Sequence, residues 1–139
     1  MTESTSKILL VEDNIGDVDL VKEALRLWGI RFDLSVVKDG SEAISYFNDS
    51  KLSDAPDLIL LDLNLPKVDG FEVLKHLKQG AHSKIPVVVF TSSSAEEDIR
   101  KSYSLNANCY VTKPFSLDQY IDIIKKIGEF WLGIVKLPH

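Results

Sequence analysis

The 139-residue chain has little cysteine and no long run of apolar or of basic residues. Cys109 stands alone, so an internal disulfide is excluded, which fits a reducing compartment. No stretch approaches the roughly 20 apolar residues of a membrane span, and the first residues lack a signal-peptide pattern. We therefore expect a cytoplasmic protein with no membrane partner. The formal net charge of −5 argues against direct contact with nucleic acid.

Short apolar runs alternate with amphipathic stretches along the whole chain. The apolar runs predict five buried strands, at 7–12, 33–38, 57–63, 86–91 and 109–112. The stretches between them predict helices at 17–28, 41–48 and 69–79, with later helices opened by two capping boxes, Ser94 with Glu97 and Ser116 with Gln119. Five such repeats predict a single α/β domain with a doubly wound parallel sheet and helices on both faces. The strand order 2-1-3-4-5 is one common solution.

Polar side chains follow four of the predicted strands. Glu12 and Asp13 end the first strand, Asp62 ends the third, Thr91 ends the fourth, and Lys113 comes just after the fifth. In the order 2-1-3-4-5, strands one and four both neighbour strand three. The carboxyl ends of parallel strands meet at one edge of a sheet, so we expect these side chains to gather around Asp62.

This combination predicts phosphoryl chemistry. Three carboxylates at one edge repel each other, and a hard divalent cation such as Mg²⁺ relieves that repulsion. Asp62 can then act as a nucleophile toward phosphorus, while Thr91 and Lys113 stabilise the phosphoryl oxygens. Each residue alone has a plainer interpretation, as a helix cap or a surface lysine. Their occurrence together at adjoining strand ends favours the chemical one.

Four segments carry a resemblance to a known family. They are "ILLVEDN" (8–14), "LILLDLNLPKVDG" (58–70), "VVVFTSS" (87–93) and "YVTKPF" (110–115). With them the chain resembles the receiver domains of two-component response regulators, which have a flavodoxin-like fold. The resemblance implies a single receiver domain over 1–139, with a core at about 7–127 and an apolar C-terminal extension at 128–139.

The resemblance also implies a metal site and an acceptor. Asp62 matches the residue that accepts a phosphoryl group from a sensor histidine kinase. Mg²⁺ would be bound by Asp13, by Asp62 and by the backbone carbonyl of Asn64, with Glu12 acting through water. Such a domain phosphorylates and dephosphorylates itself and is not a turnover enzyme.

A switch is implied as well. Thr91 and Lys113 match the hydroxyl and the lysine that contact the phosphoryl group, and Tyr110 matches the aromatic residue that turns inward when Thr91 moves. The peptide bond before Pro114 is usually cis in the family. The surface that responds would comprise the fourth and fifth strands and the helix between them, and it would bind a partner or a second copy.

The C-terminal end refines the resemblance. "NCYVTKP" and the closing "FW-L" pattern are similar to stand-alone receivers that work with phytochrome-type kinases, often as dimers through strand five, its neighbouring helices and the tail. Six apolar residues fall on one helical stripe: Tyr120, Ile123, Ile124, Ile127, Trp131 and Ile134. Gly128 and Gly133 argue against an unbroken helix there. The sequence leaves open whether the protein drives an output or serves as a phosphate sink or relay.

Three alternative functions make different demands on the sequence. A phosphatase of the haloacid-dehalogenase type also uses an aspartate and Mg²⁺, but it needs an acid where this chain has Asn64. A receiver-like interaction module that takes no phosphate is the second alternative, and it predicts decay of the site. A flavodoxin needs a loop that cradles phosphate, whereas "EDNIGD" (12–17) is acidic.

Overall fold

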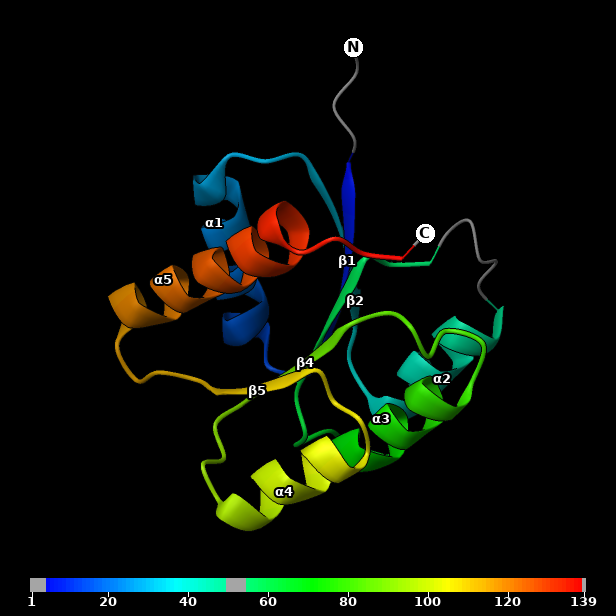
Figure 1. Ribbon diagram of the computed structural model, residues 1–139. Coiled ribbons are helices and arrows are strands. Elements are labelled where there is room, and N and C mark those ends of the chain that lie inside the picture. The colour runs from blue at the N-terminus through cyan, green and yellow to red at the C-terminus, as the bar shows by residue number, and fades with distance from the viewer. Residues whose placement is uncertain (1–4, 50–54, 139) are drawn as a thin grey trace.

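The structure is a computed structural model and describes residues 5–49 and 55–138. A five-stranded parallel sheet with strand order β2-β1-β3-β4-β5 lies at its centre (Figure 1). The strands are β1 (Ser6–Val11), β2 (Phe32–Val37), β3 (Leu58–Leu61), β4 (Val87–Thr91) and β5 (Cys109–Thr112). Every strand end lies within two residues of its predicted position. The flavodoxin-like fold is therefore confirmed.

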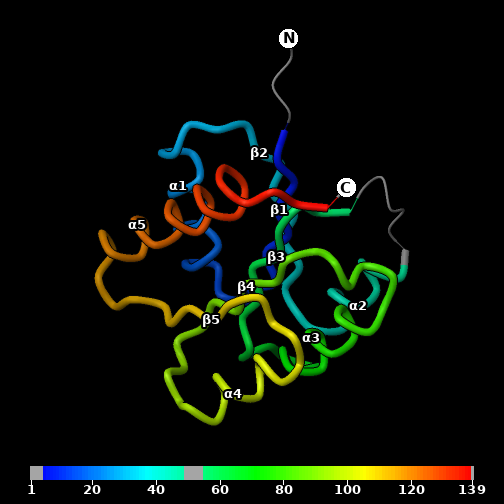
Figure 2. Tube along the Cα trace, viewed as in Figure 1, coloured from blue at the N-terminus to red at the C-terminus, as the bar shows by residue number. Residues whose placement is uncertain are grey.

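Helices cover both faces of this sheet (Figure 2). On one face, α1 (Ile15–Trp28) packs beside α5 (Leu117–Gly128), and on the other lie α2 (Gly40–Asp49), α3 (Gly70–Gln79) and α4 (Glu96–Ser104). Successive residues of the central strands point to opposite faces, so each face has its own apolar core. Among the residues that the structure describes, every helix is too short or too polar to cross a bilayer.

Four helices begin with a side-chain cap, including α2, where Asp39 Oδ1 accepts the Glu42 N–H at 2.8 Å. Asn14 Oδ1 accepts the backbone N–H of the third residue after it at 3.0 Å, and Asp69 Oδ1 does the same at 3.0 Å. Ser116 Oγ accepts the equivalent N–H at 3.3 Å, which confirms its predicted capping role. These bonds satisfy backbone donors that have no partner inside the helix.

The predicted capping box at Ser94 and Glu97 is wrong. Helix α4 has Ala95 at its cap position, with no side-chain bond. The neighbouring Ser93 supplies the polar contacts instead: its hydroxyl accepts the Ala95 N–H at 3.3 Å and donates to the Asp98 carboxylate at 2.6 Å. Two adjacent serines offer the same chemistry, and the path of the loop decides which one is used.

The predicted interruption at Gly128 is present as a change of helix type. Helix α5 ends at Gly128, and the chain continues directly into a π-helical segment, η2 (Glu129–Ile134). A Cβ atom at Gly128 would lie 2.6 Å from the ring of Trp28, the last residue of α1. This glycine therefore permits close packing of α5 on α1.

The predicted apolar stripe of α5 is confirmed only in part. Three of its members are buried and two are half-buried: Tyr120, Ile124 and Ile127, then Ile123 and Trp131. Ile134 is 69% exposed. A π-helix advances by a smaller angle per residue than an α-helix, so the stripe turns away from the core after residue 128. Phe130, 49% exposed, adds to the apolar surface there.

Candidate functional site

Backbone hydrogen bonds place two acids at the carboxyl edge of the sheet. Glu12 follows β1, and its N–H donates to Val37 O at 3.0 Å. Asp62 follows β3, and its N–H donates to Val11 O at 3.0 Å. Each acid therefore extends the parallel ladder by one residue, so its side chain has a defined direction. Asp62 is 6% exposed and Glu12 is 2% exposed.

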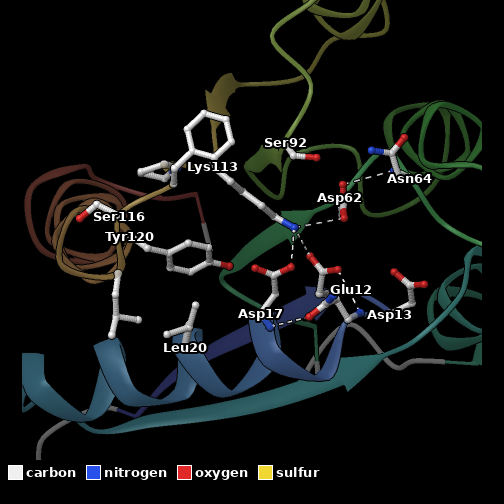
Figure 3. Close-up of a pocket in the computed structure, with 14 residues that line it drawn as sticks. Glu12, Asp13, Asp17, Leu20, Asp62, Asn64, Ser92, Lys113, Ser116 and Tyr120 are labelled. Carbon is white, nitrogen blue, oxygen red and sulfur yellow. Dashed lines mark hydrogen bonds and ion pairs between the residues drawn. The ribbon is translucent and has the colours of Figure 1, made fainter.

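Lys113 reaches these acids from the residue that follows the edge strand β5. Its backbone N–H donates to Thr91 O at 2.7 Å, which ties the residue after β5 to the end of β4. Its Nζ donates to Glu12 Oε2 at 2.7 Å, to Asp62 Oδ2 at 3.2 Å and to Asp17 Oδ2 at 3.1 Å (Figure 3). The predicted meeting of Lys113 with Glu12 and Asp62 is thus present.

Three carboxylates form a compact oxygen cluster beside the lysine. Glu12, Asp13 and Asp62 each offer an oxygen, and these oxygens all lie within 4.8 Å of one another. Asp13 is exposed and closes the cluster on its open side. Asn64 lines the same cleft, and its N–H donates to Asp62 Oδ1 at 3.2 Å. The cleft has a volume of about 470 Å³.

The charges in the cleft are unbalanced. Four carboxylates, those of Glu12, Asp13, Asp17 and Asp62, surround one ammonium group. Burial raises the pKa of Glu12 to about 7, against the lowering effect of the hydrogen bond from Lys113 and with the help of the Asp62 charge. Burial alone would lower the pKa of Lys113, but its bond to Glu12 and the surrounding negative charges outweigh this and raise it. A cleft of this kind attracts a further cation.

The two predicted switch residues lie next to the cleft. Thr91 is completely buried, and its hydroxyl has no hydrogen-bond partner among the residues described. The cleft itself is lined by Ser92 and not by Thr91. Tyr110 is half-buried and donates its hydroxyl proton to Ser93 O at 2.8 Å. Tyr110 therefore contacts the loop between β4 and α4, and the Thr91 hydroxyl, which has no partner among the residues described, can donate to a new acceptor.

The loop after Lys113 forms the opposite rim of the cleft. The peptide bond before Pro114 is trans, so the cis bond suggested by the family resemblance is absent. A trans bond is the ordinary form for a residue before proline. Phe115 follows with its side chain fully exposed at the mouth of the cleft.

Two residues of the site were missed in the sequence. Asp17 contacts Lys113 from the first turn of α1, and the hydroxyl of Tyr120 reaches the same cleft from α5 (Figure 3). Asp17 lies in the first turn of α1, where acidic residues are common at any helix, so its position gave no distinctive signal. Tyr120 matched a core position of α5, and nothing in the pattern distinguished its hydroxyl.

Comparison with known proteins agrees with this geometry. A family model described as "Response regulator receiver domain" matches residues 8–125. Response regulator Rcp1 of Synechocystis sp. is 45% identical over 135 residues, which cover 94% of this chain and 92% of Rcp1.

Solved structures are similar as well. The phosphorylated cyanobacterial phytochrome response regulator RcpA superposes with a TM-score of 0.91 at 46% identity, covering 98% of this chain and all of RcpA. The Mn²⁺-bound form of Rcp1 gives a TM-score of 0.89 at 43% identity, covering 96% of this chain and 99% of that one.

Proposed function

This chain belongs to the response regulator receiver domain family, and we propose that it accepts a phosphoryl group on Asp62 from a sensor histidine kinase. The observation that carries the proposal is the position of Asp62. Its carboxylate is nearly buried, yet it opens onto a cleft between an ammonium group and two further acids. A buried carboxylate in such a position has a nucleophile's access together with groups that stabilise negative charge.

The same cleft suits Mg²⁺. We assign Asp13, Asp62 and the backbone carbonyl of Asn64 as its ligands, with Glu12 acting through water. The donor set fits, because it consists only of oxygens and because the three carboxylates lie within 4.8 Å of one another. The Mn²⁺-bound structure of Rcp1 supports a divalent cation in this family. When bound, the cation supplies positive charge for the incoming phosphoryl oxygens.

The transfer itself needs few groups. A carboxylate oxygen of Asp62 attacks phosphorus, and the bond from phosphorus to the histidine nitrogen of the kinase breaks, with its electron pair passing to the imidazole. With a small donor such as acetyl phosphate, the phosphorus–oxygen bond breaks and acetate leaves. Lys113, whose Nζ donates to Asp62 Oδ2, compensates the charge on the phosphoryl oxygens.

Thr91 and Tyr110 connect this chemistry to a surface. The Thr91 hydroxyl has no partner now, and a phosphoryl oxygen on Asp62 would be one. Movement of Thr91 leaves space near Tyr110, whose hydroxyl would then leave Ser93 O. The surface of β4, α4 and β5 would change with it. Coupling of this kind is typically worth about 1–3 kcal/mol, so it shifts a population.

We assign the partners from the same surfaces. The relatives named as phytochrome response regulators support a phytochrome-type kinase as the donor. Exposed Phe130 and Ile134 on η2 lie beside α5 and support a homodimer through β5, α5 and the C-terminal segment. The protein then acts as a signalling domain and not as a turnover enzyme.

The two alternatives make different demands on the site. A phosphatase of the haloacid-dehalogenase type needs a general acid two residues after the nucleophile, where this chain has Asn64. A module that takes no phosphate has no use for a buried Asp62 paired with Lys113, because an unused buried ion pair stabilises a fold little. Hydrolysis of a generic phosphate ester would favour the phosphatase.

Intact mass after incubation with acetyl phosphate and Mg²⁺ tests the proposal. We expect one added phosphoryl group, lost in Asp62→Asn and in the presence of EDTA. Asp57→Asn is a matched control, because Asp57 lies at the opposite end of the same strand, where it accepts the Lys7 N–H. Size-exclusion chromatography of the same samples then tests the dimer. No added mass under any condition would refute phosphorylation of Asp62 by small donors.

A further inference from the structure

The ammonium group of Lys113 has all of its donors engaged. An ammonium carries three N–H bonds, and Nζ has three carboxylate partners, Glu12 at 2.7 Å, Asp17 at 3.1 Å and Asp62 at 3.2 Å. The Lys113 side chain is only 9% exposed, so water has little access to it. Its orientation is therefore set by protein groups.

Tetrahedral geometry makes these three bonds interdependent. If two N–H directions are held, the direction of the third follows. Glu12 and Asp17 hold two of them, and the third points at Asp62. Glu12 lies on β1 and Asp17 lies on α1, so the two anchors come from different elements.

Asp17 is well suited to act as an anchor. Its backbone N–H is held by Asn14 Oδ1 at 3.0 Å in the first turn of α1. Its side chain is 21% exposed, more buried than is usual for an aspartate on a helix surface. It does not belong to the group of carboxylates whose oxygens cluster within 4.8 Å, so the metal site leaves it free for another role.

The hydroxyl of Tyr120 lies beside the Asp17 carboxylate (Figure 3). Its hydroxyl is buried and makes no hydrogen bond of standard geometry to a described residue. Figure 3 shows it pointing toward Asp17 and the Lys113 ammonium. The ring is held by an edge contact with Phe90, with ring centroids 5.2 Å apart. A buried hydroxyl in this place needs an acceptor, and the Asp17 carboxylate is beside it.

We infer that Asp17 is a positioning residue that orients the Lys113 ammonium toward Asp62, with Tyr120 supporting the Asp17 carboxylate. The inference rests on the proposed phosphorylation of Asp62. On this inference, Tyr120 of α5 and Asp17 of α1 both influence the acceptor Asp62 through Lys113. Asp17 does not touch the phosphoryl group, and it acts only through Lys113.

The kinetic test compares three variants with the unaltered chain. Acetyl phosphate and Mg²⁺ are supplied, and the initial rate of mass gain is measured. We expect Asp17→Ala to slow phosphorylation about tenfold, the usual size for loss of a group that orients a reacting one. Asp17→Asn keeps an oxygen acceptor in the same place, so it should recover most of the rate. Asp19→Asn is the control, because Asp19 is exposed on the same helix.

A second readout does not depend on phosphorylation. The ¹⁵N–¹H signal of a lysine ammonium is observed only when hydrogen bonds slow its exchange with water. The Lys113 signal, assigned by its loss in Lys113→Met, should be present in the unphosphorylated chain, absent in Asp17→Ala and retained in Asp17→Asn. Tyr120→Phe should weaken it partially. Melting temperatures of all variants show whether each is folded.

The outcomes separate the two proposals. If the unaltered chain gains no mass, the proposed function fails, and the ammonium signal still decides whether Asp17 orients Lys113. If the unaltered chain gains mass and Asp17→Ala gains it equally fast, the positioning role is refuted. It is refuted too if Asp17→Asn is as slow as Asp17→Ala, because negative charge and not the acceptor position would then matter.

Discussion

Each end of the sheet has a lysine that makes three hydrogen bonds, and the two lysines have opposite electrostatic environments. At the carboxyl end, Lys113 has three carboxylate partners, and the negative charges raise its pKa. At the amino end, Lys78 of α3 donates to Ser83 O at 3.2 Å, to Ile85 O at 3.0 Å and to Asn108 Oδ1 at 2.7 Å. Burial lowers the pKa of Lys78, because these partners carry no charge.

This difference shows what distinguishes a chemical site from a structural one. Lys78 and Asn108 join the end of α3 to the starts of β4 and β5, since Asn108 Oδ1 also accepts the Val87 N–H at 2.8 Å. The hydrogen-bond partners of Lys78 there carry no charge. At the other end an excess of acids surrounds Lys113, and the buried Thr91 hydroxyl has no partner among the residues described. Unbalanced charge therefore distinguishes the end of the sheet at which we propose that a ligand binds.

The largest expected effect is on the rate of phosphorylation, and it separates the two lysines by function. Lys113→Met should slow phosphorylation by acetyl phosphate about 100-fold or more, because it removes the only cationic side chain among the described residues that line the cleft. Lys78→Met should leave the rate unchanged, because Lys78 lies at the other end of the sheet. Time courses of intact mass measure both. A Lys113→Met chain that keeps half of the rate would contradict this assignment.

The second-largest expected effect is on the free energy of unfolding, and it concerns Lys78. Lys78→Met keeps the aliphatic stem but leaves two carbonyls and the Asn108 amide oxygen with fewer donors. Because these hydrogen bonds are exposed or only partly buried, we expect the free energy of unfolding to fall by about 0.5–1.5 kcal/mol, the usual net contribution of a hydrogen bond. Urea unfolding measures it. Lys75→Met, an exposed position on the same helix, is the control, and equal losses in the two variants would show that the contacts of Lys78 add nothing.

A smaller effect tests the excess of acid at the carboxyl end. Asp13→Asn removes one of the clustered carboxylates. Because Asp13 is exposed and screened by solvent, we expect a gain of only about 0.3–1 kcal/mol in the metal-free free energy of unfolding. The same change should remove most of the rise in melting temperature that Mg²⁺ produces, since Asp13 is one of the proposed ligands. An undiminished Mg²⁺ effect would exclude Asp13 as a ligand.

The smallest effect is a dependence on pH at the amino end. The pKa of Lys78 is lowered in the folded chain relative to its ordinary 10.5. In the alkaline range below 10.5 the unfolded chain therefore binds more protons than the folded one, and the stability contributed by Lys78 rises with pH. The cost of Lys78→Met should grow over this range in unfolding measurements, while that of Lys75→Met stays constant. A cost that shrinks with rising pH would mean that the sign is wrong.

Most of the fold and the central residues of the site were predictable from sequence. Apolar runs located all five strands within two residues, because a parallel strand buried on both faces is apolar throughout. The helix caps at Asp69 and Ser116 were predictable too, since capping depends on residues only three positions apart. Glu12, Asp62 and Lys113 meet as predicted, because topology brings strand ends together.

The misses share a physical cause. The α-helix does end at Gly128, as predicted, but the sequence could not show that the ring of Trp28 occupies the place of its Cβ atom. Ser94 looked like a cap, but the loop presents Ser93 instead. In each case a neighbour distant in sequence, or the path of a loop, decided between residues that local propensity treats alike.

The sequence by itself determined the order and type of the elements, the apolar faces of the sheet and the acids at its edge, because these follow from local periodicity and from short-range capping. The tertiary structure alone decided which polar groups share a partner. Asp17 bonds to Lys113 from a helix that meets α5 only after folding, and Lys78 meets Asn108 in the same way. Hydrogen bonds of this kind depend on distances of a few tenths of an ångström between separate elements, and no local pattern encodes them.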